Sequence, residues 1–166
     1  MKLILKLLPV IICFFFCFTG CKKDNGTNSS DYLKGKIDEV SFECNSNMWA
    51  TLGEMGDKVI SFRGGSPPYS FSFYLDGQGS NITTGSYNFQ TGKLYSASMY
   101  ENNDPYSSGY FCSFFVPCSF YGSGKITILE INKKHIKGTF EFVTSVSGAT
   151  GMSKTVTDGE FNIKRG

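Results

Sequence analysis

Polar and apolar residues alternate along several stretches of the chain, and the clearest is residues 69–75. Three apolar side chains and a tyrosine share one face there, while two serines and Tyr74 occupy the other. Side chains two positions apart point to the same side of a β-strand. The pattern therefore predicts a strand with one buried face and one polar face.

Weaker patterns predict strands in most of the remaining chain. Residues 109–116 are apolar on both faces, which indicates a central strand. Residues 49–52 predict an extended or short helical piece, whereas the polar segments 45–48 and 101–108 predict loops. The other predicted strands are residues 33–44 (one strand or a hairpin around Asp38-Glu39), 58–63, 85–89, 94–100, 125–131, 135–143 and 155–164.

Glycine and proline divide these strands. Residues 64–68 contain two glycines and two prolines and predict a strong break, because proline cannot donate to a ladder. Gly138 lies inside a predicted strand, which indicates a bulge or a close backbone approach. Asp158-Gly159 is a turn-forming pair. In the last predicted strand we expect Phe161 to point inward and Asn162 outward.

Together these elements predict an all-β fold. The chain has 16 Phe, 9 Tyr and 19 Gly, a composition that favours sheet and turns. No helix of three turns is evident. We expect a single domain over residues 33–166, an antiparallel β-sandwich or partly open barrel of about 8–10 strands.

The first 20 residues have the layout of a signal segment. Lys2 and Lys6 precede an apolar run over residues 7–18, which ends at Thr19-Gly20. The run is shorter than the roughly 20 apolar residues of a transmembrane helix. The alternatives are a transmembrane anchor or an ordinary secretory signal, but an Ala-x-Ala-like cleavage site is missing.

The residues before Cys21 resemble a bacterial lipobox, with Phe18 where that motif usually has Leu. The resemblance implies cleavage before Cys21 and a lipid, including palmitate-type acyl chains, on its thiol. Two or three acyl chains anchor a protein stably. Residues 21–32 are then expected to form a flexible tether, because residues 22–31 are small or polar and lack large apolar side chains. We therefore expect an outer-membrane lipoprotein, facing the periplasm or the cell surface.

The formal net charge of +2 comes from the signal segment. Without Lys2 and Lys6 the chain has 14 basic and 14 acidic residues. The predicted domain has no run of basic residues longer than a pair such as Lys133-Lys134, so nothing resembles the basic stripe of a nucleic-acid-binding protein. The partners that we expect are the membrane, through the lipid, and a protein or a glycan.

Six cysteines are present, of which Cys13 and Cys17 lie in the signal segment. Beyond Cys21, the remaining three allow at most one intramolecular disulfide. Cys112 and Cys118 could pair across a hairpin, Cys44 could pair with either, or all three could be buried thiols. We expect no metal site, since the only histidine, His135, is distant in sequence and no Cys-x-x-Cys motif occurs.

The last third of the chain carries a recognisable motif pair. Gly138-Thr139-Phe140-Glu141-Phe142 is followed by Asp158-Gly159-Glu160-Phe161, and residues 33–42 supply an opening Lys-Ile-Asp segment. These motifs resemble small Bacteroidota lipoproteins of a domain-of-unknown-function family. Such proteins carry a short charged surface-export signal after the lipidated cysteine, and Lys22-Lys23-Asp24 lies at that position in this chain. The resemblance implies a fold and a location but no activity.

Catalytic chemistry is weakly represented. His135 lies at a turn beside two lysines, and no Gly-x-Ser-x-Gly elbow is present. The segment starting at Asp76-Gly77 is a turn with one carboxylate, too few for a good calcium site. The acidic residues are scattered over turns and polar faces: Asp38, Glu39, Asp76, Glu101, Asp104, Glu130 and Glu141. We therefore expect neither an enzyme nor a cofactor.

Aromatic residues near loops are the strongest functional signal. Sugar rings stack on exposed aromatic faces while polar groups bond their hydroxyls. The alternative is that these side chains only pack the core. Two functions remain: a non-catalytic interaction or accessory domain of the envelope, and a glycan-binding module of a polysaccharide-uptake system. The candidate ligand-binding aromatics are Trp49, Tyr69, Tyr100, Tyr106 and Tyr110.

Overall fold

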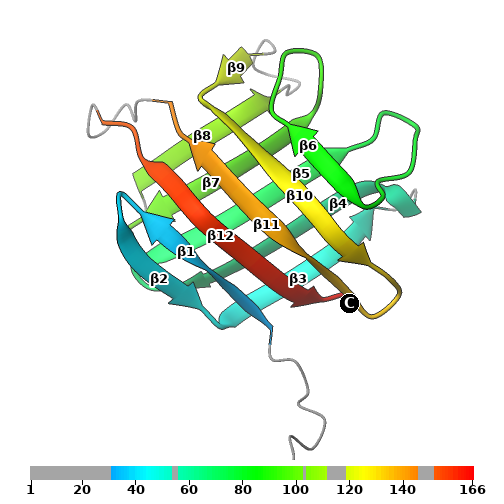
Figure 1. Ribbon diagram of the computed structural model, residues 1–166, viewed down its shortest axis with the longest axis horizontal. Helices are drawn as coiled ribbons and strands as arrows, with labels where there is room; N and C mark the ends of the chain where they lie inside the picture. The colour runs from blue at the N-terminus through cyan, green and yellow to red at the C-terminus, as the bar shows by residue number, and fades with distance from the viewer. Residues whose placement is uncertain (1–30, 54–55, 103, 112–118, 146–151) are drawn as a thin grey trace, which may run out of the picture.

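Two antiparallel sheets pack face to face and form a sandwich (Figure 1). The computed structural model describes residues 31–53, 56–102, 104–111, 119–145 and 152–166. These residues form twelve strands and no helix. The all-β prediction and the sandwich alternative are confirmed, whereas the expected count of 8–10 strands is too low.

The first sheet has six strands in the order β2-β1-β12-β11-β10-β6. Its strands cross those of the second sheet at a large angle in Figure 1, as in orthogonally packed sandwiches. The strands, in chain order, are β1 (Tyr32–Ile37), β2 (Val40–Cys44), β6 (Gly85–Asn88), β10 (Ser123–Ile131), β11 (His135–Val143) and β12 (Thr155–Lys164).

The second sheet also has six strands, in the order β3-β4-β5-β7-β8-β9. Each neighbouring pair is antiparallel. The strands are β3 (Ser46–Gly53), β4 (Gly56–Ser66), β5 (Tyr69–Asp76), β7 (Tyr95–Glu101), β8 (Asp104–Phe111) and β9 (Ser119–Tyr121). This sheet carries all the aromatic residues that the sequence singled out.

Phenylalanines from both sheets form the core. The Phe73 ring centroid lies 4.6 Å from that of Phe62 and 4.8 Å from that of Phe140, which belongs to the first sheet. Phe161 closes the cluster, with its centroid 4.5 Å from that of Phe62. Fully burying one such side chain contributes about 1.5–3 kcal/mol. The predicted burial of Phe73 and Phe161 is confirmed, and Phe140 is buried beside them.

Two predicted loops are strands. β3 begins within residues 45–48, where Asn47 has a φ of 52° and an extra residue bulges between the pairs Ser46–Gly65 and Trp49–Arg63. This bulge breaks the period of two and hides the strand. In the other segment, Pro105 lies in β8 opposite Tyr100. Proline is tolerated there because β9 pairs only with residues 109–111.

The break at residues 64–68 is shorter than predicted. β4 continues to Ser66, and only Pro67-Pro68, joined by a cis peptide bond, connects it to β5. The hairpin around Asp38-Glu39 is confirmed, with φ values of 46° and 69° at these two residues. Positive φ at both central positions matches the right-handed twist of the flanking strands.

Asp158-Gly159 is not a turn but a bulge inside β12. Lys34 pairs with Glu160 and Lys36 with Thr157, so β12 has an extra residue opposite β1. Asp158 has a φ of 51°. Gly138, in β11, makes the close approach that the sequence predicts, because a Cβ there would lie 2.1 Å from the Thr127 carbonyl oxygen.

Asn162 alternates with Phe161 in β12 and so lies on the outer face, yet it is only 7% exposed. Its register partners there are Tyr32 and Lys137. The prediction of its direction agrees with the register, but its side chain is covered rather than open to solvent. β1 also begins at Tyr32, one residue before the predicted start of the domain.

Candidate functional site

The outward side chains of four strands of the second sheet form what we call the serine–aromatic face. Strand register aligns Trp49, Arg63, Ser72 and Ser98 in one row across β3, β4, β5 and β7. Neighbouring rows place Ser70 beside Tyr100 and Ser61 beside Tyr74. The face consists of Trp49, Thr51, Ser61, Arg63, Ser70, Ser72, Tyr74, Ser98 and Tyr100.

Arg63 stacks on Trp49. The guanidinium carbon lies 4.4 Å from the centroid of the indole ring, a cation–π contact that contributes about 0.5–1 kcal/mol at an exposed site. Arg63 is exposed, and within the described residues no carboxylate lies at ion-pair distance from it. The indole N–H of Trp49 is buried, and no described residue accepts a hydrogen bond from it.

A shallow hollow of about 770 Å³ lies beside this pair. Its volume falls within the roughly 300–1,000 Å³ of small-molecule sites. Two glycines, Gly64 and Gly65, leave the floor without side chains, while Met48 packs beneath Gly64. The polar and aromatic lining includes Asn47, Arg63, Ser66, Tyr69, Ser70, Ser72, Tyr100 and Asn102.

Local hydrogen bonds hold the rim of the hollow. The Ser46 hydroxyl donates to the Gly65 carbonyl over 2.7 Å and lies 3.2 Å from the Ser66 hydroxyl. These contacts fasten the start of β3 to the end of β4. The β3 bulge therefore has a fixed position, which directs Trp49 outward over Arg63 while Met48 turns to the core.

The candidate aromatics divide between the two sides of the second sheet. Trp49 and Tyr100 are on the serine–aromatic face, where Tyr100 is 42% exposed. Tyr69 lies on the inner side, with its ring centroid 6.2 Å from that of Phe42. Tyr106 is 3% exposed and cannot offer a stacking surface to a ligand. Tyr110 is in β8, and its side chain lies outside the described part.

Tyr74 is a third aromatic on this face and was not among the candidates. It is 39% exposed. Burial, and to a smaller extent Asp76, raises the pKa of its phenol, so it remains a neutral hydroxyl at physiological pH. The alternation of residues 69–75 already placed Tyr74 opposite the phenylalanines, so that signal was sufficient to find it.

The cysteine alternatives are settled only for Cys44. It is a free thiol, 1% exposed between the sheets. Burial raises the pKa of this thiol, which keeps it protonated and unreactive. Cys21, Cys112 and Cys118 lie outside the described residues, as does the signal segment.

Most of the candidate acid–base residues have structural partners among the described residues. The His135 ring lies 3.1 Å from Glu130 at the β10–β11 turn, and Lys125 pairs with Glu141 at 3.0 Å. Lys154 bridges the two sheets, 3.4 Å from Asp38 and 3.0 Å from Glu101. The hydrogen bond to Glu101, more than its charge, raises the Lys154 pKa.

The Asp76 carboxylate accepts a 2.7 Å hydrogen bond from the backbone N–H of Gln78, and this bond stabilises the turn after β5. Within the described ranges, no three His, Cys, Asp or Glu side chains are grouped as metal ligands. The same residues include no helix that is long and apolar enough to cross a membrane.

The fold and this face define a two-sheet β-sandwich protein with one charged and one serine–aromatic outer surface. The chain belongs to the family described as a domain of unknown function (DUF6252), whose sequence profile matches residues 29–163. The match runs from just before β1 into β12 and so includes both sheets. Neither the curated proteins nor the solved structures contain a match to the chain.

Proposed function

We propose that the protein is a lipid-anchored, non-catalytic binding domain of the bacterial envelope. The lipobox-like sequence before Cys21 supports the anchor, and the serine–aromatic face is the proposed binding surface. The motif pair in β11 and β12 supports a Bacteroidota lipoprotein at the outer membrane. Lys22-Lys23-Asp24 supports display of the body at the cell surface.

The tether gives the body freedom above the membrane. Roughly ten residues separate Cys21 from Tyr32, where β1 begins. Fully extended, they reach about 35 Å, and as a flexible coil they average about 17 Å. The Asp31 carboxylate accepts a 2.9 Å bond from the Lys164 amide, so the tether joins the body beside the end of β12.

The composition of the serine–aromatic face is the observation that most directly supports the proposed binding role. Tyrosine, serine, glycine and asparagine, with occasional tryptophan and arginine, are typical of antibody paratopes. The aromatic rings supply contact area at low entropic cost, and the small polar side chains supply adaptable hydrogen bonds. The hollow beside Arg63 offers these groups on a concave surface.

A glycan-binding module of a polysaccharide-uptake system is the second candidate. It is favoured by the three aromatic side chains that share the face, Trp49, Tyr74 and Tyr100. The paired or turn-fixing carboxylates described above favour binding over hydrolysis, because each already has a structural partner.

Labelling of cells with radioactive palmitate tests the anchor. Cys21→Ser should abolish incorporation and release the body from membranes. Cys17→Ser is the matched control, since it changes a cysteine that cleavage would remove and should leave labelling unchanged. Undiminished label in Cys21→Ser would contradict the proposed anchoring.

A further inference from the structure

We propose that the serine–aromatic face binds a carboxylate-bearing saccharide chain, with Arg63 contacting the carboxylate. This inference rests on the binding role proposed above and assigns its ligand class. It depends on three features of the face: a cation that stacks on Trp49 and has no carboxylate partner among the described residues, an array of hydroxyl groups, and aromatic side chains set apart from one another.

The first feature is the state of Arg63. On the other sheet, the outer-face lysines Lys34 and Lys125 each meet a carboxylate, at 3.1 and 3.0 Å. Arg63 instead has its guanidinium carbon over the Trp49 ring, 4.4 Å from the centroid. A cation–π contact does not use the guanidinium N–H groups as hydrogen-bond donors to a carboxylate, and these groups can bind one through two parallel hydrogen bonds.

The second feature is the polar surroundings of Arg63. Serine hydroxyls both donate and accept hydrogen bonds, and the amides of Asn47 and Asn102 at the hollow do the same. A ligand rich in hydroxyl groups satisfies both functions. Tyr74 and Tyr100 are the large hydrophobic side chains that this face exposes. None of the described residues that form the face is an exposed aliphatic residue.

This composition favours a saccharide over a protein partner. Serine-rich antibody paratopes are a special class, because the centre of an ordinary protein interface is apolar and depleted in serine. Here the centre of the face, around Ser72, is a row of serine and arginine side chains. A protein surface docked there would desolvate the serines without an aliphatic contact in return.

The third feature is the spacing of the aromatic side chains. Tyr100 lies opposite Ser70, which is four positions from Tyr74 along β5. Strand geometry then separates the backbones of Tyr74 and Tyr100 by about 14 Å. Trp49 is two strands away from Ser72, so the three rings surround Arg63 and Ser72. A chain of several sugars spans this distance, whereas a single sugar does not.

The test compares acidic oligosaccharides with their neutral counterparts. Oligogalacturonate, alginate and hyaluronan oligomers are titrated into the mature full-length chain in detergent, alongside the same oligomers with carboxyl groups chemically reduced to alcohols. Trp49, the single tryptophan of the chain, reports binding by fluorescence, and calorimetry gives an independent affinity.

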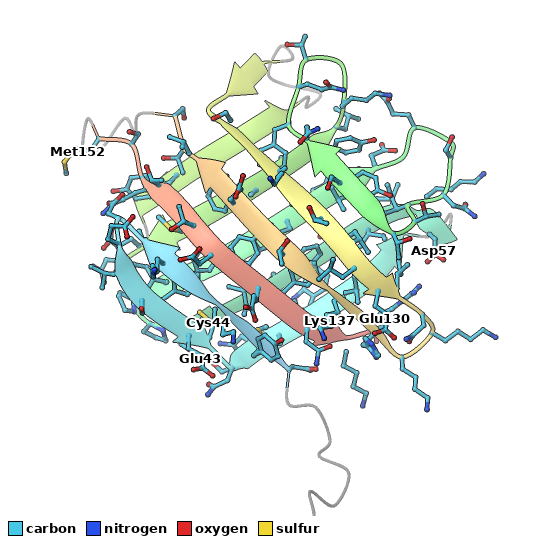
Figure 2. All side chains as sticks on the ribbon, viewed as in Figure 1. Glu43, Cys44, Asp57, Glu130, Lys137 and Met152 are labelled. Atoms are coloured by element: carbon cyan, nitrogen blue, oxygen red, sulfur yellow. The ribbon has the colours of Figure 1, made fainter. Side chains whose placement is uncertain are left out.

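We expect at least one acidic oligomer to bind about tenfold or more tightly than its reduced form, as the loss of a charge-assisted hydrogen bond requires. Arg63→Gln should remove this difference, and Arg63→Lys should keep only part of it. Lys137→Gln is the matched control, because it removes a positive charge from the outer face of the first sheet (Figure 2). It should leave the difference intact.

Three results would overturn the inference. Equal affinity for acidic and reduced oligomers would exclude the role of the carboxylate while leaving a glycan-binding face. An equal loss in Arg63→Gln and Lys137→Gln would indicate unspecific charge attraction. No binding of any oligomer at millimolar concentration would exclude the ligand class, and the palmitate experiment would still decide the anchor independently.

Discussion

The two sheets bury similar inner faces but present different outer faces to solvent. On the first sheet, oppositely charged residues pair across neighbouring strands, as in Lys34–Glu160, Lys125–Glu141 and Lys36–Asp158. On the second sheet, the corresponding positions hold serines, tyrosines, Trp49 and Arg63, and no carboxylate in the described segments pairs with this arginine. The core accounts for neither pattern, because these side chains do not contact it.

Cross-strand ion pairs are a common solution for a solvated sheet, although each contributes little when exposed. They also satisfy their own hydrogen-bonding groups, which leaves few for a ligand. The serine–aromatic face keeps its hydroxyl and guanidinium groups open. The difference between the two outer faces is therefore the main support for the proposed binding surface on the second sheet.

The largest expected effect comes from disrupting the hydrophobic core between the two sheets. Phe73→Ala removes a ring that packs within 6.3 Å of four others, centroid to centroid, from both sheets. We expect the free energy of unfolding to fall by about 3–5 kcal/mol. Urea titration followed by circular dichroism measures it. A loss below about 1 kcal/mol would show that the sheets do not share this core.

A second prediction concerns a variant in which the serine–aromatic face gains a cross-strand ion pair like those of the first sheet. Ser72→Glu places a carboxylate in the register position opposite Arg63, where the two side chains can form an ion pair. Affinity for the acidic oligomer should fall at least tenfold, since Arg63 is neutralised and the new charge repels the ligand.

The matched control for that variant is Ser41→Glu, the same substitution at an exposed position of β2. Its effect on affinity should stay below about twofold, because charges this far apart are screened at physiological salt. Equal losses in the two variants would remove the distinction between the faces.

A third prediction concerns Lys154, which bridges a turn of the first sheet and β7 of the second. Its pKa is raised above 10.5, chiefly by the hydrogen bond to Glu101, so the bridge stabilises the fold below that pH and is lost as pH rises through the folded pKa. Raised phenol pKa values at Tyr69, Tyr74 and Tyr95 act in the same direction. The unfolding free energy should therefore decrease between pH 9 and pH 11.

Lys154→Met separates these contributions. The variant loses the ammonium group but keeps the tyrosines, so its alkaline decrease should be shallower than that of the wild type. Urea titrations at several pH values provide the comparison. An identical slope in both proteins would mean that Lys154 does not couple the sheets.

The smallest expected effect is that of Trp49→Phe on stability. The indole N–H is covered and has no acceptor in the described residues, so its removal eliminates an unsatisfied donor. The change in unfolding free energy should stay within about 1 kcal/mol. A much larger loss would indicate that the Trp49–Arg63 stack supports the sheet rather than a ligand.

Regular alternation of polar and apolar residues made several strands predictable from the sequence. Residues 135–143 and 155–164 were expected as strands, and β11 and β12 have these bounds. Both strands keep a period of two over most of their length, and their phenylalanines face the core. The bulge at Asp158 was missed because Asp-Gly also forms turns, and only the pairing with β1 distinguishes the two.

The candidate site was predictable only in part. Alternation gives the direction of Tyr74, and it places Tyr69 with Phe71 and Phe73 on the inner face. The Trp49–Arg63 stack could not be predicted, because the bulge at Asn47 sets the register between β3 and β4. The burial of Tyr106 depends on the pairing of β8, which the sequence presented as a loop.

Mapping the acidic oligosaccharide by nuclear magnetic resonance tests the central claim most directly. In the isotope-labelled mature chain, we predict that ligand-induced shifts of backbone amides concentrate in β3, β4, β5 and β7, with the largest near Arg63 and Ser72. Amides of β10, β11 and β12 should remain unchanged. Shifts centred on those three strands would contradict the assignment of the binding surface to the second sheet.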